Sequence, residues 1–131
     1  MKSKLHLHTT LGGETMVGCT GGPDVAIDGS PDVGSRLLCL AAAGCYTNTL
    51  LAEAGRRGIW VGHIDVDAEL EWVECPARAQ NVTLHVRVEA DADEPAIMEM
   101  VEYADRASEV ANALRFGVSV RVADACVKAR Q

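Results

Sequence analysis

The stretch Ser35–Leu51, SRLLCLAAAGCYTNTLL, decides the fold of this chain. Its composition predicts a helix that is apolar on every side, and such a helix is expected to be buried. Polar residues nevertheless follow Cys45 directly, in the run Tyr46–Thr49. A buried hydroxyl or amide group needs a hydrogen-bond partner, or its burial costs free energy. This polar cluster beside a thiol therefore indicates a functional site within a core helix.

The composition fits one soluble domain that spans residues 1–131. Apolar residues make up 48% of the chain and charged residues 24%, which is ordinary for a globular protein. Aromatic residues are only 4%, so the core must rest on Val, Leu, Ile and Ala. The net charge of −7 argues against a partner with a phosphate backbone. We therefore expect no nucleic-acid partner.

The N-terminal residues and the cysteines predict a cytoplasmic location. The start of the chain, MKSKLHLHTTLGG, lacks the apolar core of a secretory signal, and no apolar run approaches the ~20 residues that span a bilayer. We therefore expect no membrane partner. The cysteines are odd in number and show no CxxC spacing, which favours reduced thiols over a disulfide framework. They are Cys19, Cys39, Cys45, Cys75 and Cys126.

The first half of the chain predicts three short strands and then the helix. The strands are expected at Lys4–Thr10, Thr15–Cys19 and Val25–Ile27, separated by glycine-rich turns. Ser35 is a candidate N-cap for the helix, and Arg56-Arg57-Gly58 supplies basic residues and a glycine for its end. Three short strands do not easily bury both faces alone, so we expect them to pack on a second subunit.

The second half predicts two long strands, a helix and a last strand. Apolar residues alternate with polar ones over 64–72 and 82–89, which is typical of an antiparallel sheet with one wet face. A helix is expected from Asp93 to about Gly117, with Ser108 inside its apolar stripe, followed by a strand at Val118–Val122. The predicted order is β-β-β-α-β-β-α-β, an α+β fold with antiparallel sheets and a buried central helix.

Two segments resemble the OsmC/Ohr family, the osmotically inducible protein C and organic hydroperoxide resistance proteins. They are Leu37–Leu51 (LLCLAAAGCYTNTLL) and Tyr103–Val120 (YADRASEVANALRFGVSV), which flank two long acidic-faced strands. The likeness extends in order and length over nearly the whole chain. It implies an intertwined homodimer of α+β subunits. It also implies that Cys45, at the position of the reactive family cysteine, reduces organic hydroperoxides.

The other catalytic positions of the family carry different residues here. The family's second cysteine, in a Cys-Pro-Val type motif, corresponds to Ser108 in the run Ser108–Val110. The family glutamate, ten residues before the reactive cysteine, corresponds to Ser35. An activating arginine usually comes from the N-terminal strands, but only Lys2 and Lys4 precede Arg36. Arg36 is therefore our candidate for the missing cation.

Cys45 has two interpretations. A buried cysteine can act as a small hydrophobe, but the polar run after it and its family position favour a functional thiol, with Thr47, Asn48 and Thr49 as possible donors. Cys39 lies six residues earlier, about 9 Å along a helix, which exceeds the ~7 Å limit for a disulfide. Without an internal partner, Cys45 is expected to use an external thiol reductant.

The remaining candidates have simpler alternatives. Ser108 either bonds a helix carbonyl as a core serine or lines a cavity beside Cys45. His6 and His8 are spaced to share a metal, but no third ligand is identifiable, and a solvated strand face explains them better. We expect no metal and no cofactor.

Two functions follow from these residues. In the first, the protein is a thiol peroxidase with peroxiredoxin-like activity, in which Cys45 attacks a hydroperoxide or another small electrophile and Arg36 and Ser108 assist. In the second, the protein has lost its catalytic set and binds a small apolar or electrophilic ligand at the dimer interface. The retained Cys45 favours the first, and the replaced glutamate and arginine favour the second.

Overall fold

The computed structural model describes residues 5–8, 15–19, 25–27 and 32–128, with side chains from residue 32 onward. The chain divides into two compact units, residues 1–41 with 68–83 and residues 42–67 with 84–131. Helix α1 (Val33–Arg57) and strands β4 (Val61–Val73) and β5 (Arg78–Ala90) each contribute residues to both units.

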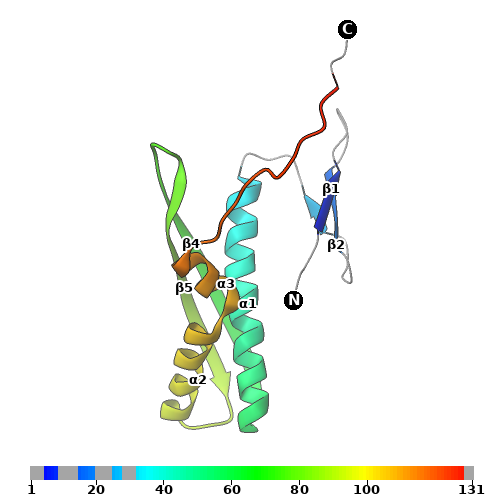
Figure 1. Ribbon diagram of the computed structural model, residues 1–131. Helices are drawn as coiled ribbons and strands as arrows, with labels where there is room; N and C mark the ends of the chain where they lie inside the picture. Colours follow the sequence, from blue (N-terminus) through cyan, green and yellow to red (C-terminus); the bar gives the residue numbers. More distant parts are fainter. Residues whose placement is uncertain (1–4, 9–14, 20–24, 28–31, 129–131) are drawn as a thin grey trace. The chain divides into compact units, whose positions relative to one another are not determined.

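The first unit contains the N-terminal sheet. Strands β1 (Leu5–His8), β2 (Thr15–Cys19) and β3 (Val25–Ile27) pair antiparallel in the order β1-β2-β3 (Figure 1). The register places Leu5 opposite Cys19. The three predicted strands are confirmed, although residues 4, 9 and 10 of the first lie outside the described residues. Among these three strands, β1 and β3 each pair along one edge only.

The hydrophobic core lies in the second unit. Helix α1 contributes Tyr46, Leu50 and Ala54, and α2 (Glu94–Ala107) contributes Met100 and Ala104. The spacing of four residues places each set on one stripe of its helix. Apolar residues of the β4–β5 hairpin pack against this cluster: Val61, Ile64, Val66, Leu84, Val86, Val88 and Ala90. Ile97 and Val101 of α2 also pack against it. The predicted alternation is confirmed over 64–70 and 82–89, whereas Trp72, at the end of the first predicted pattern, is 51% exposed.

The sequence predicts that helix α1 is buried on every side, but the structure shows that it is not. Leu51 is 47% exposed and Leu40 is 65% exposed, because the described residues of this single chain cover one stripe of the helix. By length and composition α1 could also cross a membrane, which differs from the expectation that no apolar run is long enough. The core helix of a soluble protein passes the same test, and the stripe through Leu50 is buried among core side chains.

The end of α1 follows the sequence prediction. Gly58 adopts a φ of 69°, and the N–H of Ile59 donates to the carbonyl of Ala54 at 2.9 Å, which closes the last turn. The basic residues of this turn, Arg56 and Arg57, both bond the carboxylate of Glu53. Glu53 is only 3% exposed, so these arginines compensate a buried charge.

The helix predicted from Asp93 to Gly117 is two helices. Ser108 has an extended backbone (φ −68°, ψ 116°) and separates α2 from α3 (Glu109–Phe116). The apolar stripe continues past the break, so its periodicity concealed the boundary.

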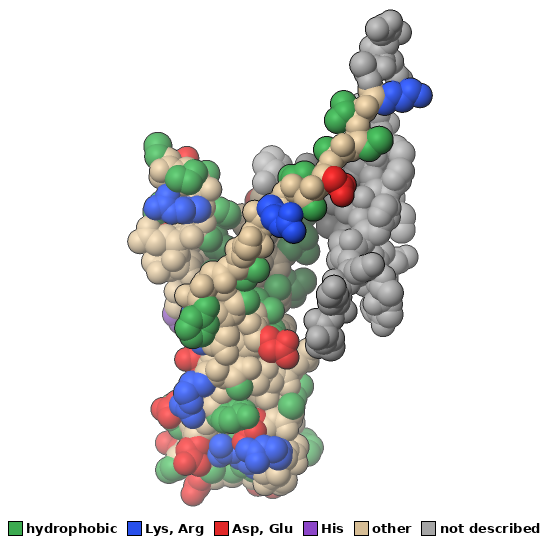
Figure 2. Space-filling view, in the orientation of Figure 1, with side chains coloured by type: hydrophobic (Ala, Val, Ile, Leu, Met, Phe, Trp, Pro, Cys, Tyr) green, Lys and Arg blue, Asp and Glu red, His purple; other side chains and the backbone are tan. Residues whose placement is uncertain are grey.

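The last predicted strand is not formed in the single chain. Residues 117–128 follow an irregular path on which hydrophobic side chains are exposed (Figure 2). Val118, Val120 and Val122 are 64%, 92% and 84% exposed. A strand needs a neighbour to pair with, and these residues have none within the described chain. The observed order is therefore β1-β2-β3-α1-β4-β5-α2-α3.

Candidate functional site

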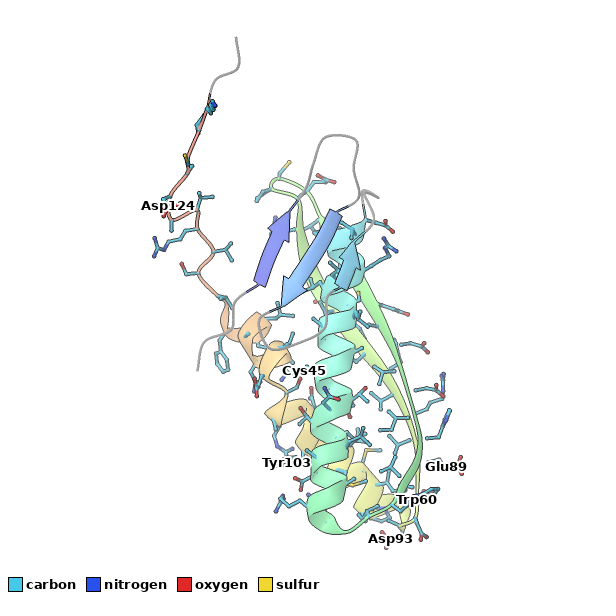
Figure 3. The ribbon with its side chains drawn as sticks, turned by 90° about the vertical axis from the view of Figure 1, so that its right-hand side faces the viewer. Cys45, Trp60, Glu89, Asp93, Tyr103 and Asp124 are labelled. Atoms are coloured by element: carbon cyan, nitrogen blue, oxygen red, sulfur yellow. The ribbon has the colours of Figure 1, made fainter. Side chains whose placement is uncertain are left out.

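The candidate site lies where α1 meets the junction of α2 and α3. Cys45 is half-buried in the middle of α1, and α3 runs beside this part of α1 in two perpendicular views (Figures 1 and 3). Ser108 is the last residue before α3 and is fully buried, with 0% of its surface exposed. Its side chain and the first two backbone N–H groups of α3 act on the Cys45 thiol.

Ser108 occupies the N-cap position of α3 without capping it. A serine at this position usually accepts a hydrogen bond from the N–H of the second or third helical residue. Here no side-chain cap bond is present, and Ser108 Oγ has no hydrogen-bond partner of ordinary geometry among the described residues. The prediction that this hydroxyl bonds a helix carbonyl is therefore wrong. The alternative, that Ser108 lines a cavity beside Cys45, stays a prediction, and the effect of Ser108 on the pKa of Cys45 is consistent with it.

Two side chains of α3 hold this helix against the end of α2. Asn112 Nδ2 donates to the carbonyl of Arg106 at 2.9 Å, and Arg115 Nη1 donates to the carbonyl of Asp105 at 2.9 Å. Arg115 also pairs with the Asp105 carboxylate. The last carbonyls of a helix have no partner within it, so Asn112 and Arg115 satisfy groups that α2 leaves free. This packing fixes the direction of the α3 N-terminus.

The environment lowers the pKa of the Cys45 thiol. Burial raises this pKa, because it disfavours the charged thiolate. The polar Ser108 side chain and the backbone N–H groups of Val110 and Glu109 lower this pKa, because they stabilise the charged thiolate. The Glu109 carboxylate raises it slightly through charge repulsion. The lowering effects together outweigh the raising ones, so the pKa of Cys45 lies below that of an ordinary cysteine. A larger fraction of Cys45 than of an ordinary cysteine is therefore the reactive thiolate near neutral pH.

The polar run after Cys45 has a different role from the one we predicted. Thr49 Oγ1 donates to the backbone carbonyl of Cys45 at 2.8 Å, and Thr47 Oγ1 donates to the carbonyl of Ala43 at 2.8 Å. Both threonines satisfy their hydroxyls within α1 and do not donate to the thiol. Tyr46 donates to the carbonyl of Val101 at 3.1 Å, and burial raises its pKa to about 12, so it remains a neutral core donor.

The other sequence candidates lie elsewhere. Arg36 lies near the start of α1, where its guanidinium is 3.6 Å from Asp32 Oδ1, and its role toward Cys45 stays a prediction. Cys75 and Cys126 are exposed, and Cys39 is half-buried on α1. The side chains of His6 and His8 lie outside the described residues. Among the residues that the structure does describe, no group of three metal-binding side chains is present.

The residue types alone do not indicate a role for the N–H groups of Glu109 and Val110. Every residue except proline has a backbone N–H, so the residue type does not show which N–H groups are free to bind a ligand. These groups are found only by locating the start of a helix. The signal was present: Ser108 is a typical N-cap residue and an acidic residue follows it, as at many helix starts. The continuous apolar stripe predicts one longer helix around Ser108 and therefore conceals this start.

The comparisons with known proteins agree with this architecture. A sequence model of the OsmC-like protein family matches residues 34–123, most of the chain. The chain belongs to the OsmC-like family. A search of curated proteins found no match. Solved structures show the same fold, at identities too low to carry function.

Three of these structures illustrate the likeness. An OsmC-like protein of Mycoplasma pneumoniae has a TM-score of 0.74 and 14% identity, over 88% of each chain. An OsmC-like protein of unknown function from Vibrio cholerae has a TM-score of 0.71 and 12% identity, over 86% of this chain and 93% of that one. An OsmC-like hydroperoxide resistance protein of Jannaschia has a TM-score of 0.57 and 16% identity, over 86% and 85%.

Proposed function

We propose that this OsmC-like protein reduces organic hydroperoxides, or reacts with a related small electrophile, through Cys45. The observation that carries the proposal is the lowered pKa of the half-buried thiol beside the start of α3. Low-pKa, accessible cysteines are the ones that react with peroxides. The name of the Jannaschia structure, a hydroperoxide resistance protein, is consistent with this chemistry.

The proposed reaction uses one cysteine. The Cys45 thiolate attacks the distal oxygen of the hydroperoxide, the O–O bond breaks, and the alkoxide leaves and takes a proton from water. Sulfur is thereby oxidised to a sulfenic acid and the hydroperoxide is reduced to an alcohol. An external thiol then forms a mixed disulfide with release of water, and a second thiol restores Cys45. The reaction requires no metal or cofactor.

The two other proposed site residues assist this thiol. Ser108 donates to the thiolate from its buried position, and Arg36 is the candidate cation that steadies the leaving oxygen. OsmC-like proteins are generally soluble, and a cytoplasmic location, where small thiols are abundant, suits an enzyme that lacks a second cysteine at position 108.

The test is trapping of the sulfenic acid. The reduced protein is treated with cumene hydroperoxide and then with a dimedone-type probe, and labelling of the Cys45 peptide is followed by mass spectrometry. We expect labelling in the native protein and none at this peptide in Cys45→Ser. If Cys45 is unlabelled while an alkylating electrophile still modifies it, hydroperoxide reduction is excluded and the electrophile-binding function takes its place.

We also propose that the protein is a homodimer. The valines at 118, 120 and 122 alternate like a strand but are exposed, and β1 and β3 each pair along one edge within the described strands. An exposed strand edge readily accepts another chain. The C-terminal segment of a second copy therefore suits one of these edges, and the exposed side of α1 near Leu51 offers further apolar surface.

Light scattering after size-exclusion chromatography tests the assembly. We expect a dimer for the native chain and a shift toward monomer for Val120→Asp, because a charge would then face the interface. Val127→Asp, beyond the predicted strand, is the control and should leave the dimer intact. A native monomer at micromolar concentration would contradict the homodimer.

A further inference from the structure

One side chain of the polar run after Cys45 is not used within the described part of the protein. Thr47 and Thr49 donate to carbonyls of α1, and Tyr46 donates to a carbonyl of α2. Asn48 is exposed and makes no hydrogen bond with any residue that the structure describes. Its side-chain NH₂ group is therefore available as a donor, three residues after the reactive thiol.

Cys45 lies at the boundary between the buried and the exposed sides of α1. Tyr46 and Leu50 belong to the core, whereas Cys45 itself is half-buried. The exposed residues of α1 from position 46 to position 55 are Asn48, Leu51, Ala52 and Gly55. Of these four, only Asn48 has a polar side chain, and it lies within one turn of Cys45 on the same side of the helix. A substrate that approaches the thiol from the exposed side therefore meets an apolar surface with one amide group.

Asn48 is close enough to act on a molecule bound at the sulfur. Side chains three residues apart on a helix are neighbours, with Cβ atoms about 5–6 Å apart. Helical side chains also lean toward the N-terminus of their helix, so Asn48 leans toward the turn that carries Cys45. In the proposed reaction the sulfur attacks the distal oxygen of the hydroperoxide, and the leaving oxygen lies one bond farther away. A side-chain N–H of Asn48 can therefore reach the leaving oxygen.

We propose that Asn48 is a catalytic residue whose side-chain N–H donates a hydrogen bond to the leaving oxygen of the hydroperoxide. This inference rests on the proposed reaction of Cys45. As the S–O bond forms and the O–O bond breaks, negative charge passes from the sulfur to the leaving oxygen. A hydrogen bond to that oxygen strengthens as the charge develops, so it stabilises the transition state more than the bound substrate. Asn48 keeps its proton, and the alkoxide takes one from water.

The composition of this chain around Cys45 makes such a donor necessary. Ser35 stands ten residues before Cys45, where the resemblance places a glutamate, and no arginine precedes Arg36. Arg36 lies nine residues before Cys45 on α1, whereas Asn48 lies three residues after it. Asn48 is therefore the nearer of the two candidate donors along the helix, and both can act on the same oxygen.

The experiment compares two reactions of Cys45 in the full-length reduced protein. The first is the rate of sulfenic acid formation with cumene hydroperoxide, trapped by a dimedone-type probe and measured at the Cys45 peptide by mass spectrometry. The second is the rate of alkylation by iodoacetamide, which needs the thiolate but has no leaving oxygen. Asn48 is not among the groups that shift the pKa of Cys45, so the alkylation rate should not depend on it.

Three variants separate the donor from the rest of the polar run. Asn48→Ala removes the donor, and we expect the hydroperoxide reaction to slow about tenfold or more, as for loss of a hydrogen bond to a charged group, while alkylation stays unchanged. Alanine favours a helix more than asparagine does, so this variant should fold. Asn48→Gln keeps an amide on a longer side chain and should recover part of the rate. Thr47→Val is the matched control, because it removes a hydroxyl that is already bonded within α1, and it should leave both rates unchanged.

The outcomes distinguish this inference from the proposed function. A slower hydroperoxide reaction in Asn48→Ala with unchanged alkylation, partly restored in Asn48→Gln, supports the inference. If Asn48→Ala slows both reactions equally, or slows neither, the inference is overturned and the proposed reaction of Cys45 stands. If the native protein forms no sulfenic acid at Cys45, the proposed function fails, and the inference fails with it.

Discussion

The starts of α2 and α3 show two uses of the same structural feature. At α2, the Asp93 carboxylate accepts a hydrogen bond from the N–H of Ala96 at 3.0 Å, and a proline follows in the first turn. At α3, Ser108 makes no such bond, and its hydroxyl and the first N–H groups act on the Cys45 sulfur. The first helix start is satisfied locally and contributes stability. The second leaves its donors available for chemistry.

The difference follows from burial. Asp93 is exposed, so its charge remains solvated while it caps α2. Ser108 is fully buried between α2 and α3, where a carboxylate would be costly to place. A small neutral hydroxyl can be buried there and can donate to a thiolate, which a carboxylate cannot do.

Replacing Ser108 with aspartate, the residue that caps α2, is the change with the largest expected effect on the reactivity of Cys45. In Ser108→Asp, the carboxylate would cap α3 and repel the thiolate, so the pKa of Cys45 should rise. We expect alkylation of Cys45 by iodoacetamide near neutral pH to slow about tenfold or more, measured at the Cys45 peptide. Ser108→Asn, a neutral cap of similar size, is the control and should slow it much less. Equal rates in the two variants would contradict a charge effect.

Alanine in place of Asp93 and alanine in place of Ser108 should have different effects on the free energy of unfolding. Asp93→Ala removes a formed cap, and the free energy of unfolding should fall by about 1 kcal/mol. Ser108→Ala removes a buried hydroxyl that has no partner of ordinary geometry, so the free energy of unfolding should stay the same or rise by up to about 1 kcal/mol. Urea denaturation of both variants measures the difference. A loss of stability in Ser108→Ala as large as that in Asp93→Ala would show that Ser108 is an ordinary structural cap.

Loosening the α2–α3 junction should have the smallest effect. Arg115→Ala removes the contacts with Asp105, which are partly exposed. We expect Cys45 alkylation to slow roughly two- to fivefold, in line with the strength of exposed ion pairs. Arg87→Ala, which removes an exposed ion pair with Asp67 on the hairpin, is the matched control and should leave the rate unchanged. If both variants slow the reaction equally, Arg115 has no specific positioning role.

Most of the fold was predictable because its signals are local. The alternation in β4 and β5 and the glycine after Arg57 identify a hairpin and a helix end from neighbouring residues alone. The break at Ser108 was harder to predict, because the apolar stripe keeps its helical spacing through it and outweighs the short N-cap signal of Ser108 and Glu109. Contacts of Asn112 and Arg115 with the end of α2, which are made in three dimensions, help to fix that break.

The site was predictable only in part. The position of Cys45 in an apolar helix and its family resemblance identified the thiol, and Ser108 was placed beside it by that resemblance. The threonines after Cys45 misled the prediction, because their hydroxyls bond carbonyls of their own helix. The N–H groups that act on the sulfur belong to the backbone, so their role depends on where α3 begins and which way it points.

The pH dependence of Cys45 alkylation tests the central claim most directly. Only the thiolate reacts, so the rate rises as the pH passes the pKa of the thiol. Because the start of α3 lowers this pKa, we predict a half-maximal rate at a lower pH in the native protein than for Cys45 in the urea-unfolded chain. Ser108→Ala should move this midpoint upward. A native midpoint at or above the unfolded one, unchanged in Ser108→Ala, would contradict activation of Cys45 by the start of α3.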